Sequence, residues 1–288
     1  MQFVRSYAKI NLTLDVVGRR SDGYHKLMTI MQTIDLHDTI CLTATEDNSV
    51  HMVCTRPELS NDDNLIVRAV QAICQYVGLK QGIAIELHKR IPVAAGLGGG
   101  SSNAATVLLA MKHWWQLSLS TVDLQAIAAT LGSDVPFFLT GGLALCEGRG
   151  ERITPLAYRL PPAMRWILLV KPAISLSTAE VFRDVTVRDY SDGTASRSIL
   201  AALAEGGHQL PLEHLLHNSL ERSVLEHHPQ VAQACEDMLY AGAPYVRLSG
   251  SGPTLFSTFS NLSQAAQVQQ QLCAQEYEVY LTHAIASY

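Results

Sequence analysis

The sequence of 288 residues has little net charge, no Cys-x-x-Cys pair and no apolar run long enough to cross a bilayer. Its formal net charge of −5 argues against a protein that binds nucleic acid or membrane surfaces, because phosphate backbones require a basic face. The apolar stretch WILLV at 166–170 is too short to span a membrane and is typical of a buried strand. The N-terminal stretch lacks the apolar region of a signal peptide, so we expect a cytoplasmic protein.

The cysteines and histidines form no recognisable ligand or disulfide framework. The cysteines are far apart along the chain, which is typical of reduced, mostly buried thiols in a cytosolic protein; they are Cys41, Cys54, Cys74, Cys146, Cys235 and Cys273. The later histidines have no Cys or carboxylate partners at metal-ligand spacing, so we interpret them as helix surface and predict no metal site there; they are His208, His214, His217, His227 and His228. The chain has no internal repeat and no low-complexity tract.

Hydrophobic periodicity predicts a mixture of strands and helices without strict alternation, which favours an α+β fold. In KINLTLDVV the apolar residues face a core, and a polar face carries Lys9, Asn11, Thr13 and Asp15. The stretch 62–78 predicts a helix that Gly78 ends, with a core face formed by Leu65, Ala69, Ala72, Ile73 and Tyr76. A second helix is expected to start at a capping box from Ser120 to Asp123 and to end at Gly132. Residues 175–241 read as mostly helical, with a loop near YSDGTASRS.

Glycine, by contrast, is concentrated in RIPVAAGLGGGSSNAATVLLAM, residues 90–111. Such a loop can turn successive backbone N–H groups toward one point, and the following helix adds its unpaired donors, which together favour a phosphate site. The hydroxyls of Ser101 and Ser102 can cap this helix, contact phosphate or hold Mg²⁺. A P-loop is excluded because no Lys follows Gly100, and Ser101 stands where a dinucleotide fingerprint needs its third glycine. The plain alternative is a glycine-rich turn with a serine cap.

Three motifs together resemble the GHMP kinases, named for galactokinase and the homoserine, mevalonate and phosphomevalonate kinases. They are AKINLTLDVVGRRSDGYHKL at 8–27, PVAAGLGGGSSNAA at 92–105 and LSGSGPTLF at 248–256. The middle motif resembles the ATP-phosphate loop of the whole superfamily. The first motif is similar to the branch that phosphorylates the 2-hydroxyl of 4-diphosphocytidyl-2-C-methyl-D-erythritol, in the non-mevalonate (methylerythritol phosphate) isoprenoid precursor pathway.

This resemblance implies a two-domain α+β fold and a soluble ATP-dependent kinase. The N-terminal domain, residues 1–160, would resemble ribosomal protein S5 and carry the glycine-rich loop; residues 161–288 would form a ferredoxin-like GHMP kinase C-terminal domain. The Pro161–Pro162 pair is the predicted boundary. ATP with Mg²⁺ and a cytidine diphosphate conjugate would be the small-molecule partners, without nucleic acid or membrane, in a monomer or weak homodimer.

The resemblance also implies residue roles, each with a plain structural alternative. Asp134 would orient the attacking hydroxyl and accept its proton, with Lys9 nearby stabilising the transferred charge; the alternatives are a helix N-cap at Asp134 and a solvated strand lysine. Tyr24 would stack on cytosine and His25 would hydrogen-bond it. Phe182 would close the pocket, with core packing as its alternative. Asn11 and Thr178 would contact substrate; the alternative for Asn11 is a surface amide.

The remaining predicted positions concern ATP and the third motif. The ATP-binding residues would be Pro92, Ala94, Ala95, Gly96, Leu97, Gly98, Gly99, Gly100, Ser101 and Ser102, with Asn64, Leu65 and Lys89 on the adenine side. The third motif would act through Ser249, Gly250, Ser251 and Gly252, for which a tight hairpin turn is the alternative. A GHMP kinase for homoserine or mevalonate is the second hypothesis, although those substrates need no base-stacking pair. A non-catalytic nucleotide-binding protein is the third.

Overall fold

The computed structural model describes residues 1–157, 159–205 and 214–286. The chain forms two compact units, of which the first comprises Met1–Ala8, Leu36–Val93 and Gly98–Thr140 and the second comprises Lys9–Asp35, Ala94–Leu97 and Gly141–Tyr288. Strands β1 (Gln2–Arg19) and β2 (His25–Thr45) contribute residues to both units, as does the glycine loop. These units do not coincide with the predicted domains 1–160 and 161–288, whose boundary stays a prediction.

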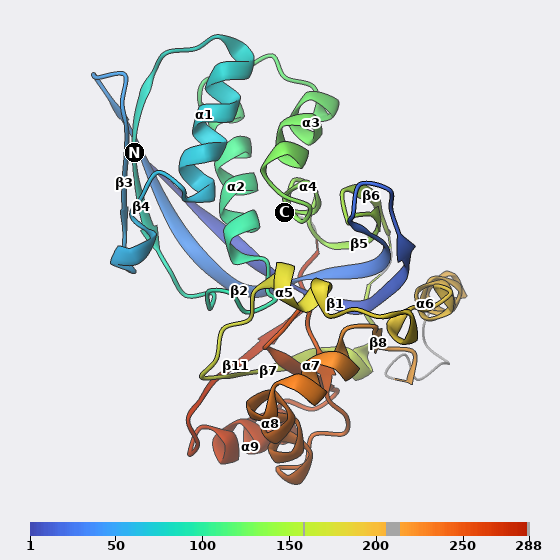
Figure 1. Ribbon diagram of the computed structural model, residues 1–288. Helices are drawn as coiled ribbons and strands as arrows, with labels where there is room; N and C mark the ends of the chain where they lie inside the picture. Colours follow the sequence, from blue (N-terminus) through green and yellow to red (C-terminus); the bar gives the residue numbers. More distant parts are fainter. Residues whose placement is uncertain (158, 206–213, 287–288) are drawn as a thin grey trace. The chain divides into compact units, whose positions relative to one another are not determined.

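The first unit combines three paired strands with four helices. The second half of β2 pairs antiparallel with β4 (Gly82–His88), and β3 (Val50–Cys54) pairs parallel with β4. A 3-10 turn, η1 (Pro57–Leu59), follows β3. Helices α1 (Leu65–Val77), α2 (Gly99–Trp114) and α3 (Thr121–Leu131) pack against one another, as Figure 1 shows, and the short α4 (Val135–Phe138) packs on α2 and α3.

Local sequence signals set the ends of these helices as predicted. Gly78 ends α1 in the left-handed conformation, with φ +69°, and Ser120 and Asp123 form the expected capping box of α3. The predicted core face of α1 was wrong in part, because Tyr76 is 54% exposed. The buried face is instead formed by Ile66, Val67, Ala69, Val70 and Ile73. A helix can place Val67 and Val70 inward only by turning Tyr76 toward solvent.

The second unit contains one mixed sheet built on the first two strands. The first half of β2 pairs antiparallel with β5 (Leu143–Gly148), and β5 pairs with β6 (Arg152–Pro155). Strand β1 lies beside β2 and pairs in parallel with the short β8 (His217–Asn218), matching Thr13 with His217. The segment of β1 in this unit is buried on both faces, so its polar face is not solvated.

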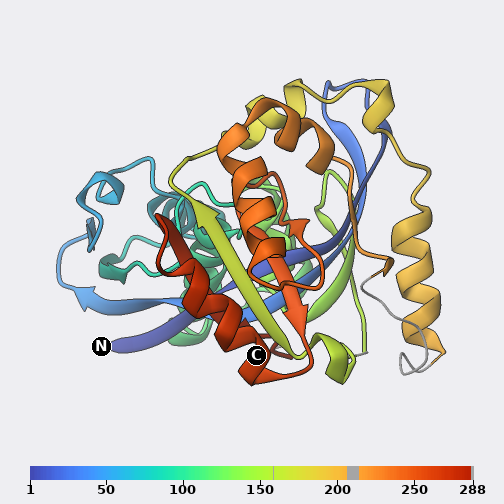
Figure 2. The ribbon, with the colours of Figure 1, turned by 90° about the horizontal axis from the view of Figure 1, so that it is seen from below.

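A separate four-stranded antiparallel sheet has the order β11-β7-β10-β9. Its strands are β7 (Trp166–Pro172), β9 (Arg247–Leu248), β10 (Leu255–Phe259) and β11 (Tyr277–His283). Helices α8 (Pro229–Tyr240) and α9 (Leu262–Leu272) pack on β7 and β10, as Figure 2 shows, and α7 (Glu221–His227) packs on α8. The apolar core between them includes Leu168, Val170, Val231, Met238 and Leu255.

The chain between β7 and β8 is partly helical, as expected. It contains α5 (Thr178–Arg183), the 3-10 turn η3 (Val187–Asp189) and α6 (Thr194–Ala204). Another 3-10 turn, η2 (Pro162–Met164), precedes β7. The predicted loop near YSDGTASRS was wrong for its second half, because Thr194 begins α6 directly after Gly193. Gly193 supplies the left-handed N-cap, with φ +82°, that lets the helix start there.

Candidate active site

The glycine loop turns into helix α2 through residues in the left-handed conformation. Gly96 and Gly98 have φ +72° and +69°, and the helix begins at Gly99, inside the glycine run. The first helical hydrogen bond runs from Ser102 N to Gly98 O over 2.8 Å. The amides of Gly99, Gly100 and Ser101 precede that bond and are therefore available donors at the positive end of the helix dipole, as a phosphate site requires.

A buried carboxylate holds the chain just before this loop, and sequence reasoning missed it. Asp38 is fully buried and accepts hydrogen bonds from the backbone amides of Arg90 and Ile91, at 2.7 and 2.8 Å. It also accepts from Nζ of Lys89 at 2.8 Å and from Nδ2 of Asn103, on α2, at 2.9 Å. One carboxylate therefore fixes both the entry to the loop and the first turns of the helix that follows it.

Lys89, predicted on the adenine side, is committed to this network. Its side chain is 6% exposed, and its Nζ donates to Asp38 and, at 2.6 Å, to the carbonyl of Ile91. Burial lowers the pKa of the Lys89 ammonium, while Asp38 acts in the opposite direction. A Cβ at Gly99 would lie 3.0 Å from this Nζ, a tight contact that favours glycine where α2 passes the lysine. These contacts show that Lys89 stabilises the chain that leads into the glycine loop. Its predicted contact with adenine stays a prediction.

The other two predicted adenine-side residues open α1. Asn64 caps this helix by accepting from Ile66 N at 2.9 Å, and its Nδ2 donates to Leu59 O at 2.9 Å, so the amide has a sufficient structural explanation. The side chain of Leu65 lies beside Gly100, with Cδ1 3.5 Å from the position that a Cβ would occupy. Leu65 therefore lines the outer side of the first turn of α2.

The two serines after the glycines point to different environments. Ser102 is fully buried, and its hydroxyl accepts from Ser6 at 2.7 Å, within a network that includes Asn103. The side chain of Ser102 is therefore part of the core rather than a phosphate ligand. Ser101 is partly exposed at the third position of α2. Of the two predicted hydroxyl contacts, the structure leaves only that of Ser101 at the surface of the loop.

The apolar side chains of the loop face inward. Pro92, Ala95 and Leu97 are buried, whereas Ala94 and Gly100 are exposed. Ala94 has φ +50°, an uncommon conformation for a residue with a side chain. Any contact of the buried residues with a nucleotide would therefore be made by their backbone.

In the second unit, all three motifs meet at one carbonyl oxygen of the glycine loop. The O atom of Gly96 accepts from Nζ of Lys9 at 2.9 Å and from Oγ of Ser249, in the third motif, at 3.2 Å. Lys9 also donates to Oδ1 of Asn11 at 2.6 Å. A Cβ at Gly250 would lie 3.0 Å from both Gly96 O and Lys9 Nζ, and a Cβ at Gly96 would lie 2.1 Å from Ser249 O. The glycines are therefore required for this approach.

Lys9 and Asn11 are not surface residues. They are 3% and 2% exposed, which rules out the solvated-lysine and surface-amide alternatives. Asn11 donates through Nδ2 to Oγ1 of Thr29 at 2.8 Å, and Thr29 donates to the carbonyl of Thr13. Lys9 is buried and donates a hydrogen bond to an amide that is itself held in place, so its ammonium is kept in one position. A group that stabilises charge on a reactant requires such a fixed position.

Asp134 stands at the N-cap position of α4, but its side chain makes no capping hydrogen bond. The residue has helical backbone angles, φ −85° and ψ −14°, rather than the extended conformation of a typical cap. The N-cap alternative is therefore wrong for the side chain. The helix start instead depends on Pro136 in its first turn.

An aromatic cluster surrounds His25. Its ring stacks on Phe182, with centroids 5.5 Å apart and an interplanar angle of 29°, and meets Tyr190 edge-on at 6.1 Å. Burial lowers the pKa of His25, and the charge of Arg19 lowers it further. Phe182 is partly buried and packs on the core as well, as its alternative interpretation expected.

Tyr24 lies on the open side of this region and is 54% exposed. The guanidinium of Arg149 lies over its ring, 5.0 Å from the centroid, and is a neighbour that sequence reasoning did not find. The Asp22 carboxylate accepts from Tyr24 N at 3.2 Å and from Arg20, which closes the turn before the tyrosine.

The third motif is connected to α5 and β8. The hydroxyls of Thr178 and Ser251 lie 2.9 Å apart, which brings a residue predicted to contact substrate next to one of the third motif. Thr178 and Phe182 share one helix at a spacing of four, so both lie on one face as expected. The Nδ2 atom of Asn218 donates to the carbonyl oxygens of Leu248 and Gly250, at 2.9 and 2.8 Å, and so anchors the third motif.

Potential metal ligands do not gather in the described part of the chain. No group of three or more His, Cys, Asp or Glu residues that could hold a metal ion occurs within 1–157, 159–205 and 214–286. His208 lies outside the described residues.

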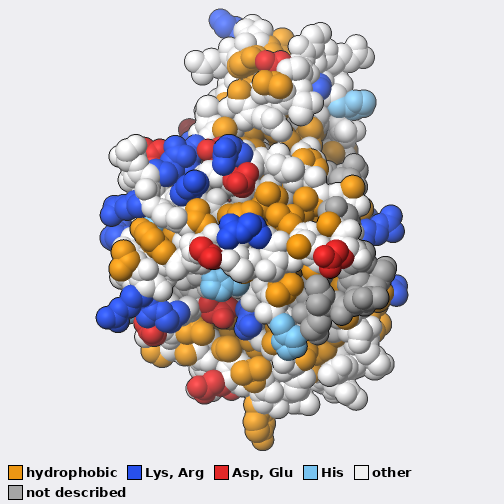
Figure 3. All heavy atoms as spheres, turned by 90° about the vertical axis from the view of Figure 1, so that its right-hand side faces the viewer, with side chains coloured by type: hydrophobic (Ala, Val, Ile, Leu, Met, Phe, Trp, Pro, Cys, Tyr) orange, Lys and Arg blue, Asp and Glu red, His pale blue; other side chains and the backbone are white. Residues whose placement is uncertain are grey.

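All six cysteines are free thiols, three of them buried. Figure 3 shows acidic, basic and apolar side chains interspersed on the face that it draws. Within the described part, no helix has the length and apolar character needed to cross a bilayer.

Comparisons with known proteins agree on one family. The models of the GHMP kinases N terminal domain and the GHMP kinases C terminal domain match residues 64–142 and 199–278. The chain is 40% identical to a 4-diphosphocytidyl-2-C-methyl-D-erythritol kinase of Alkaliphilus metalliredigens, covering 99% of this chain and 96% of that protein. It is 39% identical to the enzyme of that name from Geobacillus kaustophilus, covering 96% and 95%.

Solved structures give the same result. A crystal structure of 4-(cytidine 5'-diphospho)-2C-methyl-D-erythritol kinase is 34% identical, with a TM-score of 0.83, and covers 98% of this chain and 99% of that one. A homoserine kinase from Cytophaga hutchinsonii has a TM-score of 0.72 at 15% identity, over 100% and 96% of the two chains, which is a likeness of fold alone. The expected α+β fold of two GHMP kinase domains is thereby confirmed.

Proposed function

We propose that this chain, which belongs to the 4-diphosphocytidyl-2-C-methyl-D-erythritol kinase family of the GHMP kinases, transfers the γ-phosphoryl group of ATP to the 2-hydroxyl of that cytidyl substrate. The observation that carries the proposal is the meeting of all three motifs at Gly96 O, through Lys9 and Ser249. A glycine-rich turn with a serine cap would need neither contact.

The chemistry follows from what phosphoryl transfer demands. The reaction requires positioned reactants and stabilisation of charge on the transferred group more than it requires a strong base. Asp134 would orient the 2-hydroxyl and accept its proton, the role that the family resemblance implies for this carboxylate. Lys9 would stabilise charge as the γ-phosphoryl group moves, because its buried ammonium is already held by Asn11 and Gly96 and needs little reorganisation.

The substrate side of the proposal rests on the cluster around His25. A cytosine ring offers a flat apolar face and a polar edge, which aromatic side chains and a hydrogen-bonding ring can recognise. Tyr24 would supply the stacking face, since it is the exposed aromatic, and His25 the hydrogen bond. The 5.5 Å between the rings of His25 and Phe182 is too close for a base to enter between them, so the base would lie beside this pair. Thr178 and Asn11 would contact the methylerythritol end.

For ATP, the available amides of Gly99, Gly100 and Ser101 would bind phosphate oxygens. Mg²⁺ would enter as the ATP complex, where it neutralises phosphate charge. This ion commonly keeps several waters and takes few protein ligands, so the lack of a three-residue ligand cluster in the described chain fits it. The partly exposed Ser101 hydroxyl would offer it an oxygen ligand at the glycine loop. A cytoplasmic location and a monomeric or weakly dimeric state remain predictions.

The decisive experiment measures ADP release by the purified protein with ATP, Mg²⁺ and 4-diphosphocytidyl-2-C-methyl-D-erythritol, beside homoserine and mevalonate. We expect turnover with the cytidyl substrate only. Turnover with a small substrate instead would retain the kinase but refute the base pocket. ATP binding without any turnover would instead support a non-catalytic nucleotide-binding protein.

A further inference from the structure

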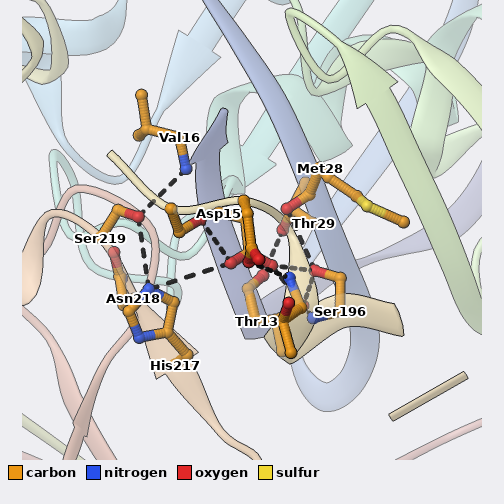
Figure 4. A network of polar contacts seen from close by, with 12 residues as sticks. Thr13, Asp15, Val16, Met28, Thr29, Ser196, His217, Asn218 and Ser219 are labelled. Atoms are coloured by element: carbon orange, nitrogen blue, oxygen red, sulfur yellow. Dashed lines mark hydrogen bonds and ion pairs between the residues drawn. The ribbon is translucent and has the colours of Figure 1, made fainter. Parts of the chain in front are cut away.

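A second buried carboxylate lies on β1, six residues after the lysine. Asp15 is fully buried, and one of its oxygens accepts from the hydroxyl of Ser191 at 2.6 Å. The other oxygen accepts from the amide of Ser196 at 3.0 Å and from the hydroxyl of the same serine. Figure 4 shows Asp15 and Ser196 facing each other at the centre of a polar network that also includes Thr13.

This carboxylate caps helix α6 from a distant strand. The N-cap residue of α6 is Gly193, which has no side chain to accept a hydrogen bond, and Ser196 N belongs to the first turn. With φ +82°, a residue with a side chain would be strained at Gly193, and its Cβ would lie 3.1 Å from Sδ of Met28, so glycine is favoured there over a conventional capping residue. Asp15 therefore supplies the missing acceptor, and the positive end of the helix dipole helps to stabilise its charge. The ring nitrogen Nε2 of His217 lies 3.9 Å from Oδ1 of Asp15.

The same contacts fix the segment that carries Tyr190. Ser191 is attached twice to β1, by its hydroxyl to Asp15 and by its amide to Val16 O at 2.9 Å. Tyr190, immediately before it, meets His25 edge-on. On the N-terminal side of Tyr190, the Asp189 carboxylate accepts from Thr186 N at 2.8 Å, which closes the 3-10 turn η3. The same carboxylate forms an ion pair with Arg222. The position of Tyr190 against His25 thus depends on both ends of a short, anchored segment.

We propose that Asp15 is a positioning residue for the substrate pocket, which it serves by clamping residues 191–196 to β1 and so seating Tyr190 as a third aromatic wall beside His25. This inference rests on the function proposed above. It gives a role to residues 189–196, which lie outside the three sequence motifs. Asp15 itself touches no substrate; its effect reaches the pocket through Ser191 and Tyr190.

The test compares KM for the cytidyl substrate, KM for ATP and kcat in three variants. Asp15→Asn replaces one acceptor oxygen by a donor, Ser191→Ala removes only the contact next to Tyr190, and Tyr190→Leu removes the aromatic edge. We expect each to raise KM for the cytidyl substrate, by about tenfold for Asp15→Asn and Tyr190→Leu, because small misplacements of a binding wall weaken orientation. KM for ATP and kcat should change less than twofold, and Tyr190→Phe should restore the wild-type KM.

Ser223→Ala is the matched control, because Ser223 is a buried serine of the same unit whose hydroxyl faces His227 instead of the clamp. Binding of cytidine 5′-diphosphate, measured by calorimetry, provides a readout independent of turnover. If Asp15→Asn does not fold, Ser191→Ala and Tyr190→Leu decide. Folded variants that keep the wild-type KM and the wild-type affinity for cytidine 5′-diphosphate would overturn the clamp. A wild-type protein that neither binds cytidine 5′-diphosphate nor turns over the substrate would overturn the proposed function, and the inference with it.

Discussion

The Nζ atom of Lys9 donates to the carbonyl oxygen of Gly96 over 2.9 Å, so a strand side chain and the backbone of the glycine loop hold each other in place. Lys9→Met should therefore remove charge stabilisation and also loosen the loop. We expect kcat to fall about 10²- to 10³-fold, in the range found when one electrostatic donor is removed from an active site. Steady-state kinetics with Lys9→Arg as the charge-retaining control would show whether position or charge matters more. A Lys9→Met enzyme with near wild-type kcat would contradict the role.

Asp134→Asn keeps the shape of the side chain but removes its ability to accept a proton. Because the side chain does not cap α4, the fold should tolerate the change. Turnover should fall by about 10²- to 10⁴-fold, the usual contribution of a general base. Equilibrium binding of ATP should stay within about twofold of wild type, since Asp134 is not assigned to the nucleotide. Asp123→Asn, in the capping box of α3, is a suitable control, since it should lower stability without this loss of rate.

The two neighbouring serines should respond in opposite ways. Ser102→Ala breaks a buried hydrogen bond to Ser6 and should lower the free energy of unfolding by about 1–2 kcal/mol, with little change in KM for ATP. Ser101→Ala should leave unfolding almost unchanged and raise KM for ATP several-fold. Urea denaturation and ATP titration of both variants test this prediction. If the two substitutions changed the free energy of unfolding and KM for ATP to the same extent, the assignment of different roles to the two serines would be refuted.

Asp38 and Lys89 form an ion pair in which both side chains are almost fully buried. Asp38→Asn leaves the ammonium without its counter-charge and should cost about 3–5 kcal/mol of stability, while raising KM for ATP because the loop entry is released. The double variant Asp38→Asn/Lys89→Met removes both charges and should regain part of the lost stability. Urea midpoints of the single and double variants test this, and strictly additive losses would argue against a coupled pair.

His25 should make the folded state sensitive to acid. Its pKa is lowered from the ordinary value of 6.5, first by burial and then by Arg19. As pH falls through 6.5, the unfolded chain gains a proton that the folded chain resists, so stability decreases until the pH passes below the folded pKa. His25→Gln should flatten this part of the curve relative to wild type. Urea midpoints between about pH 7.5 and about pH 5.5 provide the measurement, with the exposed His88→Gln as control.

Local signals in the sequence accounted for much of the architecture. The glycine stop of α1, the capping box of α3 and the apolar alternation of β1 each depend on neighbouring residues, so they could be read directly. The family resemblance was confirmed, and it rested on three complete motifs rather than on the properties of single residues. The residue roles stay predictions, supported by contacts such as that between Thr178 and Ser251.

What the sequence did not reveal depends on contacts between distant residues. Asp38 and Asp15 look like ordinary polar residues of strands, because their partners lie 51 or more and 176 or more positions away along the chain. The face of α1 was misjudged because Tyr76 fits the helical period, while only the packing of its neighbours decides which side is buried. The cation over Tyr24 comes from Arg149, in a turn with no motif of its own.

The pairing of Thr13 with His217 has a consequence for how the chain is made. Strand β8 follows β1 about two hundred residues later along the chain, so the two strands that flank β1 in this sheet, β2 and β8, lie far apart in sequence. Non-local pairing of this kind slows folding and leaves an unpaired strand edge exposed in the meantime. A nascent chain that stops before residue 217 therefore lacks the edge strand of β1, and we expect it to depend on chaperones until synthesis passes that point.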